Sequence, residues 1–211
     1  VNAVAMAAGL AEGGPERARE KLAEVWEAIT RAGVPELLRY YPLLAGLARL
    51  GGIASGQVAS LAGVLSPSEL NPFDLNPLRK LLLEHVDFAR IARSSPLQLM
   101  IAATDVDTGL ARLFGTAELT ADVVLASACL PTLHRAVRIG NRHYWDGGYS
   151  ANPELLALTR AGAARDTLIV LLNPMSEPSV PMQARDIANR MSRITFNQPL
   201  LAQIAQIEAL R

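Results

Sequence analysis

Two helical patterns of apolar residues occupy the first part of the chain. Residues 1–11 are small and almost entirely apolar, which predicts a buried helix. Pro15 stands where a helix start favours proline, and residues 16–31 then repeat apolar side chains at helical spacing with charged side chains between them. The second pattern therefore predicts an amphipathic helix whose charged face lies in solvent.

The next stretch has an unusual lack of charge. Between residues 40 and 67 the only charged side chain is Arg49, and leucines alternate with several glycines. This composition predicts a mobile apolar cover, with packing into the core as the alternative. A turn cluster at residues 71–77 and two short helical patterns follow, so residues 40–95 are predicted to form a variable helical cap or lid.

The remainder alternates between strand and helix patterns. Continuous apolar runs at residues 97–104 and 168–172 predict strands buried on both faces. The pair Gly140-Asn141 favours a hairpin turn. Further strands are predicted at residues 112–114, 136–139 and 143–145, and helices at 78–85, 88–92, 120–128, 153–160, 182–194 and 199–211. This alternation predicts an α/β layered fold, with residues 1–211 in a single domain.

Composition narrows the classes of partner. Half of the residues are hydrophobic and mean hydropathy is +0.20, which is ample for a buried core. Lys plus Arg and Asp plus Glu both number 20, so the formal charge is zero and no basic surface attracts nucleic acid. The single cysteine, Cys129, excludes an internal disulfide and favours a reducing, cytoplasmic location. No apolar stretch reaches the ~18 to 20 residues of a membrane span.

The segment Trp145-Asp146-Gly147-Gly148 is the strongest candidate for chemistry. Glycines after an aspartate allow a tight turn and close approach of another group. An aspartate held beside aromatic side chains can gain basicity by desolvation and act as a general base. The alternative is an aspartate that only caps a turn, which is its commoner role before glycine.

Several segments together resemble the patatin-like phospholipase family of bacterial type. They are Thr104-Asp105-Val106-Asp107-Thr108-Gly109, Ala126-Ser127-Ala128-Cys129-Leu130-Pro131, Tyr144-Trp145-Asp146-Gly147-Gly148 and Asn152-Pro153. The resemblance implies a three-layer α/β/α domain and hydrolysis of acyl esters of lipids by a serine-aspartate dyad. It further implies that Asp146 is the dyad aspartate. Gly147 and Gly148 would let the backbone fold tightly at the site, while Asn152 and Pro153 would fix the entry to the next helix.

The serine of that dyad is expected outside the 211 residues. The family places it in a Gly-x-Ser-x-Gly elbow, and no such sequence occurs here. Val1-Asn2-Ala3 resembles the continuation of the elbow, so the nucleophile and a glycine-rich oxyanion loop are expected upstream of Val1, and the domain is expected to be incomplete at its N-terminus. The alternative is a non-catalytic module that binds acyl lipids without a nucleophile.

Other reactive side chains have weaker patterns. The serines considered as substitutes, Ser55, Ser127 and Ser150, lack the flanks of an elbow, and the three histidines fit neither a triad nor a zinc motif. Asp105 and Asp107 lack the further ligands of a calcium loop, which favours a structural turn. Neither a metal nor an organic cofactor is expected. The predicted partners are a phospholipid or another acyl ester and, transiently, a membrane surface.

Overall fold

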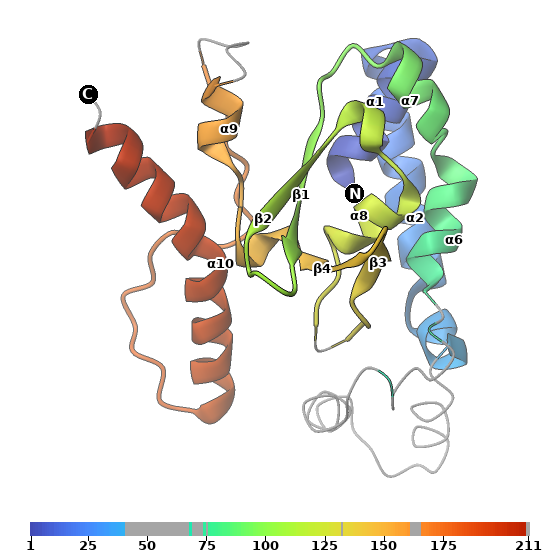
Figure 1. The fold of residues 1–211 in the computed structure, drawn as a ribbon. Coiled ribbons are helices and arrows are strands. Elements are labelled where there is room, and N and C mark those ends of the chain that lie inside the picture. Colours follow the sequence, from blue (N-terminus) through green and yellow to red (C-terminus); the bar gives the residue numbers. More distant parts are fainter. Residues whose placement is uncertain (41–67, 69–73, 75, 132, 161–165, 210–211) are drawn as a thin grey trace.

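The computed structural model describes residues 1–40, 68, 74, 76–131, 133–160 and 166–209 (Figure 1). The predicted cover at 40–67 and most of the turn cluster at 71–77 therefore lie outside the described residues. The domain boundaries and the lid at 40–95 stay predictions.

The first two helices form an antiparallel pair. Helix α1 spans Asn2–Gly13 and α2 spans Pro15–Tyr40, joined through Gly14, whose φ of 84° suits glycine. Gly9 lets the two backbones approach closely, since a Cβ there would overlap the main chain of Ala18. Val4 and Ala7 are fully buried, which confirms the predicted buried helix.

Helices α6 (Pro77–His85) and α7 (Phe88–Ser94) confirm the two short helical patterns. Each begins at a side-chain cap. Asn76 Oδ1 accepts from the Leu78 amide at 3.0 Å, and Asp87 Oδ1 accepts from the Arg90 amide at 2.8 Å. Their buried residues, Leu82 and Ile91, join the main core.

A four-stranded sheet in the order β2-β1-β4-β3 lies at the centre, and its neighbouring strands are antiparallel. The strands are β1 (Met100–Asp105), β2 (Ala111–Gly115), β3 (Val137–Ile139) and β4 (Arg142–Asp146). The predicted hairpin across Gly140-Asn141 is confirmed, with Gly140 at a φ of 63°. The register places Ala103 opposite Asp146, so the middle of the sheet sets the position of this aspartate.

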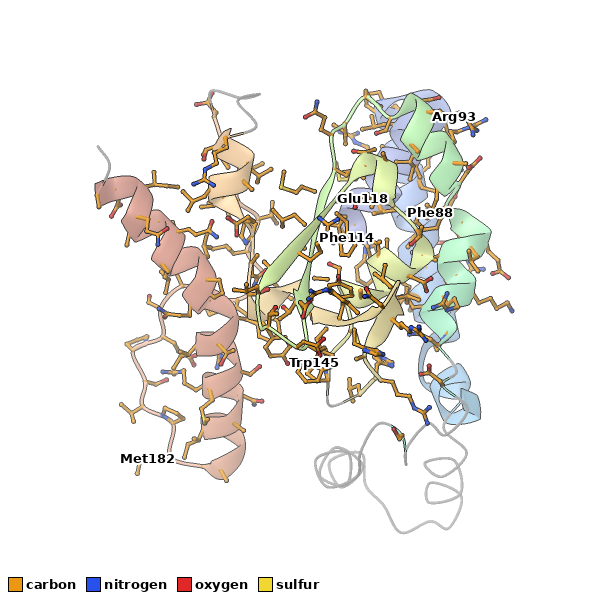
Figure 2. All side chains as sticks on the ribbon, viewed as in Figure 1. Phe88, Arg93, Phe114, Glu118, Trp145 and Met182 are labelled. Carbon is orange, nitrogen blue, oxygen red and sulfur yellow. The ribbon has the colours of Figure 1, made fainter. Side chains whose placement is uncertain are left out.

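One face of the sheet carries the main core. Ile101, Ala103, Phe114 and Tyr144 are buried there with residues of α1 and α8 (Ala121–Ala126). Figure 2 shows Phe114 on the side of the sheet that faces these helices. On the other face Met100 remains 37% exposed, so the prediction of a strand buried on both faces is wrong for the first half of β1.

Helices lie on both sides of the sheet. Helices α1, α2, α6, α7 and α8 lie on one side, and α9 (Leu155–Arg160) and α10 (Ala184–Ala209) lie on the other (Figure 1). Two short 3₁₀ helices, η1 (Thr116–Glu118) and η2 (Gly147–Tyr149), follow β2 and β4. The predicted α/β class is confirmed.

The region after α9 differs from the prediction. Residues 168–172 form no strand, and the side chains of Leu168, Val170 and Leu172 are 90%, 86% and 99% exposed. A continuous apolar run becomes a strand only where a neighbouring strand pairs with its backbone, and none of the described strands is hydrogen-bonded to this segment. The apolar pattern alone could not reveal that.

Helix α10 is continuous through Pro199, so the prediction of two helices separated near this residue is wrong. Proline removes one helical hydrogen bond and bends the helix, and Figure 1 shows α10 changing direction in its middle. Tertiary contacts hold the helix on both sides of the bend. Asn152 Nδ2 donates to the Phe196 carbonyl at 3.0 Å, and Leu200 is buried.

Candidate active site

Asp146 ends β4 and is fixed at three of its polar groups. Its amide donates to the Cys129 carbonyl at 2.9 Å, and its carbonyl accepts from Thr104 Oγ1 at 2.7 Å. Its Oδ1 accepts from the Gly148 amide at 2.8 Å, which caps η2. The turn-capping role considered from the sequence is therefore present, and it leaves the second carboxylate oxygen, Oδ2, available for another partner.

The two glycines after Asp146 allow close packing on both sides. A Cβ on Gly147 would overlap the main chain of Ala102 in β1, and a Cβ on Gly148 would overlap the ring of Phe196 in α10. Neither glycine has a positive φ. They are therefore needed here for space, and their close partners in the structure are β1 and α10.

Asn152 and Pro153 precede α9, but the helix begins at Leu155, so the prediction that Pro153 starts it is wrong. The cause is a cap from a distant part of the chain. Gln203 Oε1, on α10, accepts from the amides of Leu155 and Leu156 at 2.6 and 3.2 Å. The same side chain donates to Glu154 Oε2 at 2.6 Å. The helix therefore starts at Leu155, because the first amides of a helix lack partners within it and Gln203 accepts their hydrogen bonds here.

A cavity of about 240 Å³ opens beside Asp146. Its lining combines apolar side chains of β1 and β2 with the polar turn after β4 and the start of α9. All four site-supporting residues of the sequence prediction lie in it together with Asp146. The lining residues are Met100, Ile101, Ala102, Leu113, Ser127, Asp146, Gly147, Gly148, Ala151, Asn152, Pro153, Glu154 and Leu158.

Burial sets the electrostatics of the site. It raises the pKa of Asp146 above its ordinary value, while the hydrogen bond from the Gly148 amide acts in the opposite direction. The Val1 nitrogen is close enough to Asp146 for the two groups to interact electrostatically. The N-terminal end of α1 therefore lies within electrostatic reach of Asp146, beside the sheet (Figure 1).

A comparison with models of known protein families shows the family to which this chain belongs. The family model described as patatin-like phospholipase matches residues 4–158. The chain belongs to the patatin-like phospholipase family. No curated protein and no solved structure gives a significant match. Membership of the family indicates a lipid acyl hydrolase that acts on lipid substrates.

In this patatin-like chain the described side chains among the other candidate nucleophiles occupy positions that cap a helix or make hydrogen bonds within the fold. Ser127 is the C-cap residue of α8 and lines the cavity, Ser150 Oγ lies 2.8 Å from Thr104 Oγ1, and Ser55 lies outside the described residues. The Cys129 thiol is buried and directed at the Arg135 carbonyl at 3.1 Å. Burial raises the pKa of this thiol to about 11, which suppresses the reactive thiolate.

The structure also describes the surroundings of Asp105 and of the three histidines. Asp105 Oδ1 accepts from the amides of Asp107 and Thr108, and its Oδ2 pairs with Arg142 Nη1 at 2.6 Å, which confirms a structural turn. None of the three histidines lines the cavity. Among the described residues, no three His, Cys, Asp or Glu side chains are grouped as a metal site requires. Within the same residues, no helix has the length and hydrophobicity needed to cross a membrane.

The sequence did not predict which residues make hydrogen bonds to the main chain of Asp146. Thr104 belongs to a motif that the sequence singled out, yet nothing in its pattern showed that its hydroxyl reaches the Asp146 carbonyl. The Cys129 carbonyl, which accepts from the Asp146 amide, left no signal in the sequence, and neither did the side chain of Gln203, which caps α9. These contacts come from the main chain or from residues far away in the sequence, so spacing cannot reveal them.

The raised pKa of Asp146 predicts how Asp146→Asn changes stability with pH. In wild type, a raised folded-state pKa means that stability is full below the unfolded pKa of 3.8 and falls as pH rises through the folded-state value. Asparagine does not titrate and can still accept the Gly148 hydrogen bond. The variant should therefore gain melting temperature relative to wild type between about pH 4 and pH 7. Thermal unfolding at both pH values tests this, and a relative loss at pH 7 would contradict it.

Proposed function

We propose that this patatin-like protein hydrolyses carboxylic ester bonds of phospholipids or other acyl lipids with a serine-aspartate dyad. Asp146 is the base, and the nucleophilic serine precedes Val1 in the full-length protein. The observation that carries the proposal is the position of Asp146, which lies at a cavity wall and close to the amino end of α1, since the Val1 nitrogen is within electrostatic reach of its carboxylate. A serine just before this helix would therefore face the free carboxylate oxygen.

The amino end of α1 is also suited to stabilise negative charge. Within the described residues no side chain caps the start of α1, so no side-chain acceptor among them binds the first amides of this helix. Such amides, together with the helix dipole, favour an anion. The same end of the helix would therefore support both the activated serine and the oxyanion that forms when it attacks an ester.

The proposed reaction has two steps. In the first, the serine oxygen attacks the ester carbonyl carbon while Asp146 accepts the serine proton, and the alcohol leaves with that proton as the acyl-enzyme forms. In the second, Asp146 takes a proton from water, which attacks the acyl carbon, and as the bond to the serine oxygen breaks, Asp146 returns the proton to the serine and the fatty acid leaves. A partly buried carboxylate with a raised pKa is a better base than one in water, which supports this role.

The surroundings of Asp146 support a lipid substrate. A second and more apolar cavity of about 520 Å³ shares Met100 and Leu158 with the Asp146 cavity, so an apolar group next to the scissile bond has room. Contact with a membrane surface and a cytoplasmic location both stay predictions.

A fluorophosphonate reagent, which reacts covalently with activated serines, tests the position of the nucleophile. We expect it to label the full-length protein at one serine shortly before Val1, as located by peptide mass spectrometry. Labelling should be much slower in Asp146→Asn, because the serine then lacks its base. The control is Ser127→Ala, in which the same serine should still be labelled.

Two outcomes would contradict the dyad. Labelling at Ser127 or Ser150 would place the nucleophile inside the described chain. The absence of labelling, combined with saturable binding of a fluorescent fatty acid, would favour the alternative of a lipid-binding module without a nucleophile.

A further inference from the structure

Two hydroxyl groups form a chain of hydrogen bonds that ends at the Asp146 carbonyl, and neither hydroxyl takes part in the proposed reaction steps. Thr104, on β1, is 5% exposed, and its Oγ1 lies 2.7 Å from the Asp146 carbonyl oxygen and 2.8 Å from Ser150 Oγ. Ser150 directly follows η2. The two side chains thus connect the central strand to the turn that carries Asp146.

The direction of these hydrogen bonds follows from the chemistry of the groups. A carbonyl oxygen only accepts, so Thr104 must donate its single hydroxyl hydrogen to Asp146. Thr104 then has only acceptor sites left, and Ser150 must be the donor in the contact between the two hydroxyls. The result is one directed chain from Ser150 through Thr104 to the Asp146 carbonyl. Hydrogen bonds linked in this way strengthen one another.

We propose that this hydroxyl chain positions Asp146, with Thr104 and Ser150 as positioning residues. The proposal rests on the proposed function, in which Asp146 Oδ2 is the base. The Asp146 amide and Oδ1 are held by Cys129 and Gly148, and the Thr104 bond fixes the carbonyl. With all three groups held, the aspartate has one orientation, and Oδ2 is the oxygen left to receive the serine proton.

The expected effect is on the chemical step and little on substrate binding. A displacement of about 1 Å in a catalytic group can cost roughly a hundredfold in rate. Thr104 and Ser150 do not line the cavity beside Asp146, so substrate contacts there should survive their replacement. Loss of the chain should therefore lower kcat and leave KM nearly unchanged.

Steady-state kinetics of four variants of the full-length protein, with a short-chain p-nitrophenyl ester, test the proposal. Thr104→Val keeps the shape of the side chain without the donor and should lower kcat by about ten- to a hundredfold. Thr104→Ser restores the hydroxyl and should recover most of the loss. Ser150→Ala removes only the outer member and should cost less than Thr104→Val. Thr120→Val is the control, because it removes a comparable hydroxyl contact, to the Val123 amide, at the start of α8.

The control separates positioning from stability. Thr120→Val should lower the melting temperature while kcat stays at the wild-type value. The proposal is overturned if Thr104→Val keeps wild-type kcat, if Thr104→Ser is as slow as Thr104→Val, or if Thr120→Val loses kcat equally. Should Thr104→Val fail to fold, an unchanged kcat in Ser150→Ala would overturn it. A wild-type protein without any esterase activity would instead contradict the dyad, and the positioning role with it.

Discussion

Asp146→Asn should lower kcat of the full-length protein toward a short-chain p-nitrophenyl ester by about 10² to 10⁴-fold, the usual contribution of a general base. The asparagine side chain can still accept the hydrogen bond from the Gly148 amide, so the turn after β4 should keep its shape. What it loses is a carboxylate oxygen that can take a proton. KM should change little, and the far-ultraviolet circular dichroism spectrum should match that of wild type.

A matched control is available in the same sheet. Asp105→Asn also replaces a carboxylate shielded from solvent, but Asp105 is more deeply buried, belongs to a structural turn and pairs with Arg142 at 2.6 Å. The control variant should lose stability above pH 3.8, where the wild-type ion pair is present, because Arg142 holds the pKa of Asp105 below its ordinary value. Its kcat should stay close to wild type. Full activity in Asp146→Asn would refute the assignment of the base.

The second large effect is expected for Gly147→Ala. The added methyl group would overlap the main chain of Ala102, which is paired with Leu113 of β2, next to the point where β1 pairs with β4, and has little freedom to move aside. We expect the free energy of unfolding to fall by about 3 kcal/mol, at the upper end of the usual cost of overpacking. Urea denaturation measures it, and kcat should fall as well because the shift displaces the neighbouring Asp146.

Two other glycines provide the comparison. Gly148→Ala meets the ring of Phe196, a side chain that can rotate, and should cost less, about 1 kcal/mol. Gly115→Ala has only Glu118 Oε2 near its methyl group, at 3.8 Å, and should stay within about 0.5 kcal/mol of wild type. If Gly147→Ala were as stable as Gly115→Ala, the close packing of the turn on β1 would be wrong.

Local patterns in the sequence gave correct predictions wherever local physics decides the outcome. The run of small apolar residues at 1–11 placed α1, short helical patterns placed α6 and α7, and the pair Gly140-Asn141 placed the hairpin between β3 and β4. The segment around Asp146 was recognised for the same reason, because glycine allows tight turns and close contacts. The match of the family model to residues 4–158 agrees with the resemblance inferred from these motifs.

Predictions failed where an element depends on a distant partner. Residues 168–172 have the composition of a buried strand, but a strand requires a neighbour, and none of the described strands pairs with them. Helix α10 passes through Pro199 because contacts from Asn152 and with α9 hold it on both sides. Helix α9 begins at Leu155 because Gln203, 48 residues later, supplies its cap.

The sequence by itself determined the α/β class, the family and the choice of Asp146, since these depend on residue type and short-range spacing. Only the tertiary structure decided how Asp146 is held. Its amide and carbonyl are bound by groups from two distant segments, Cys129 and Thr104, and burial raises its pKa. Such contacts arise when segments far apart in the chain pack together, and the energy of a partly buried carboxylate depends on that packing.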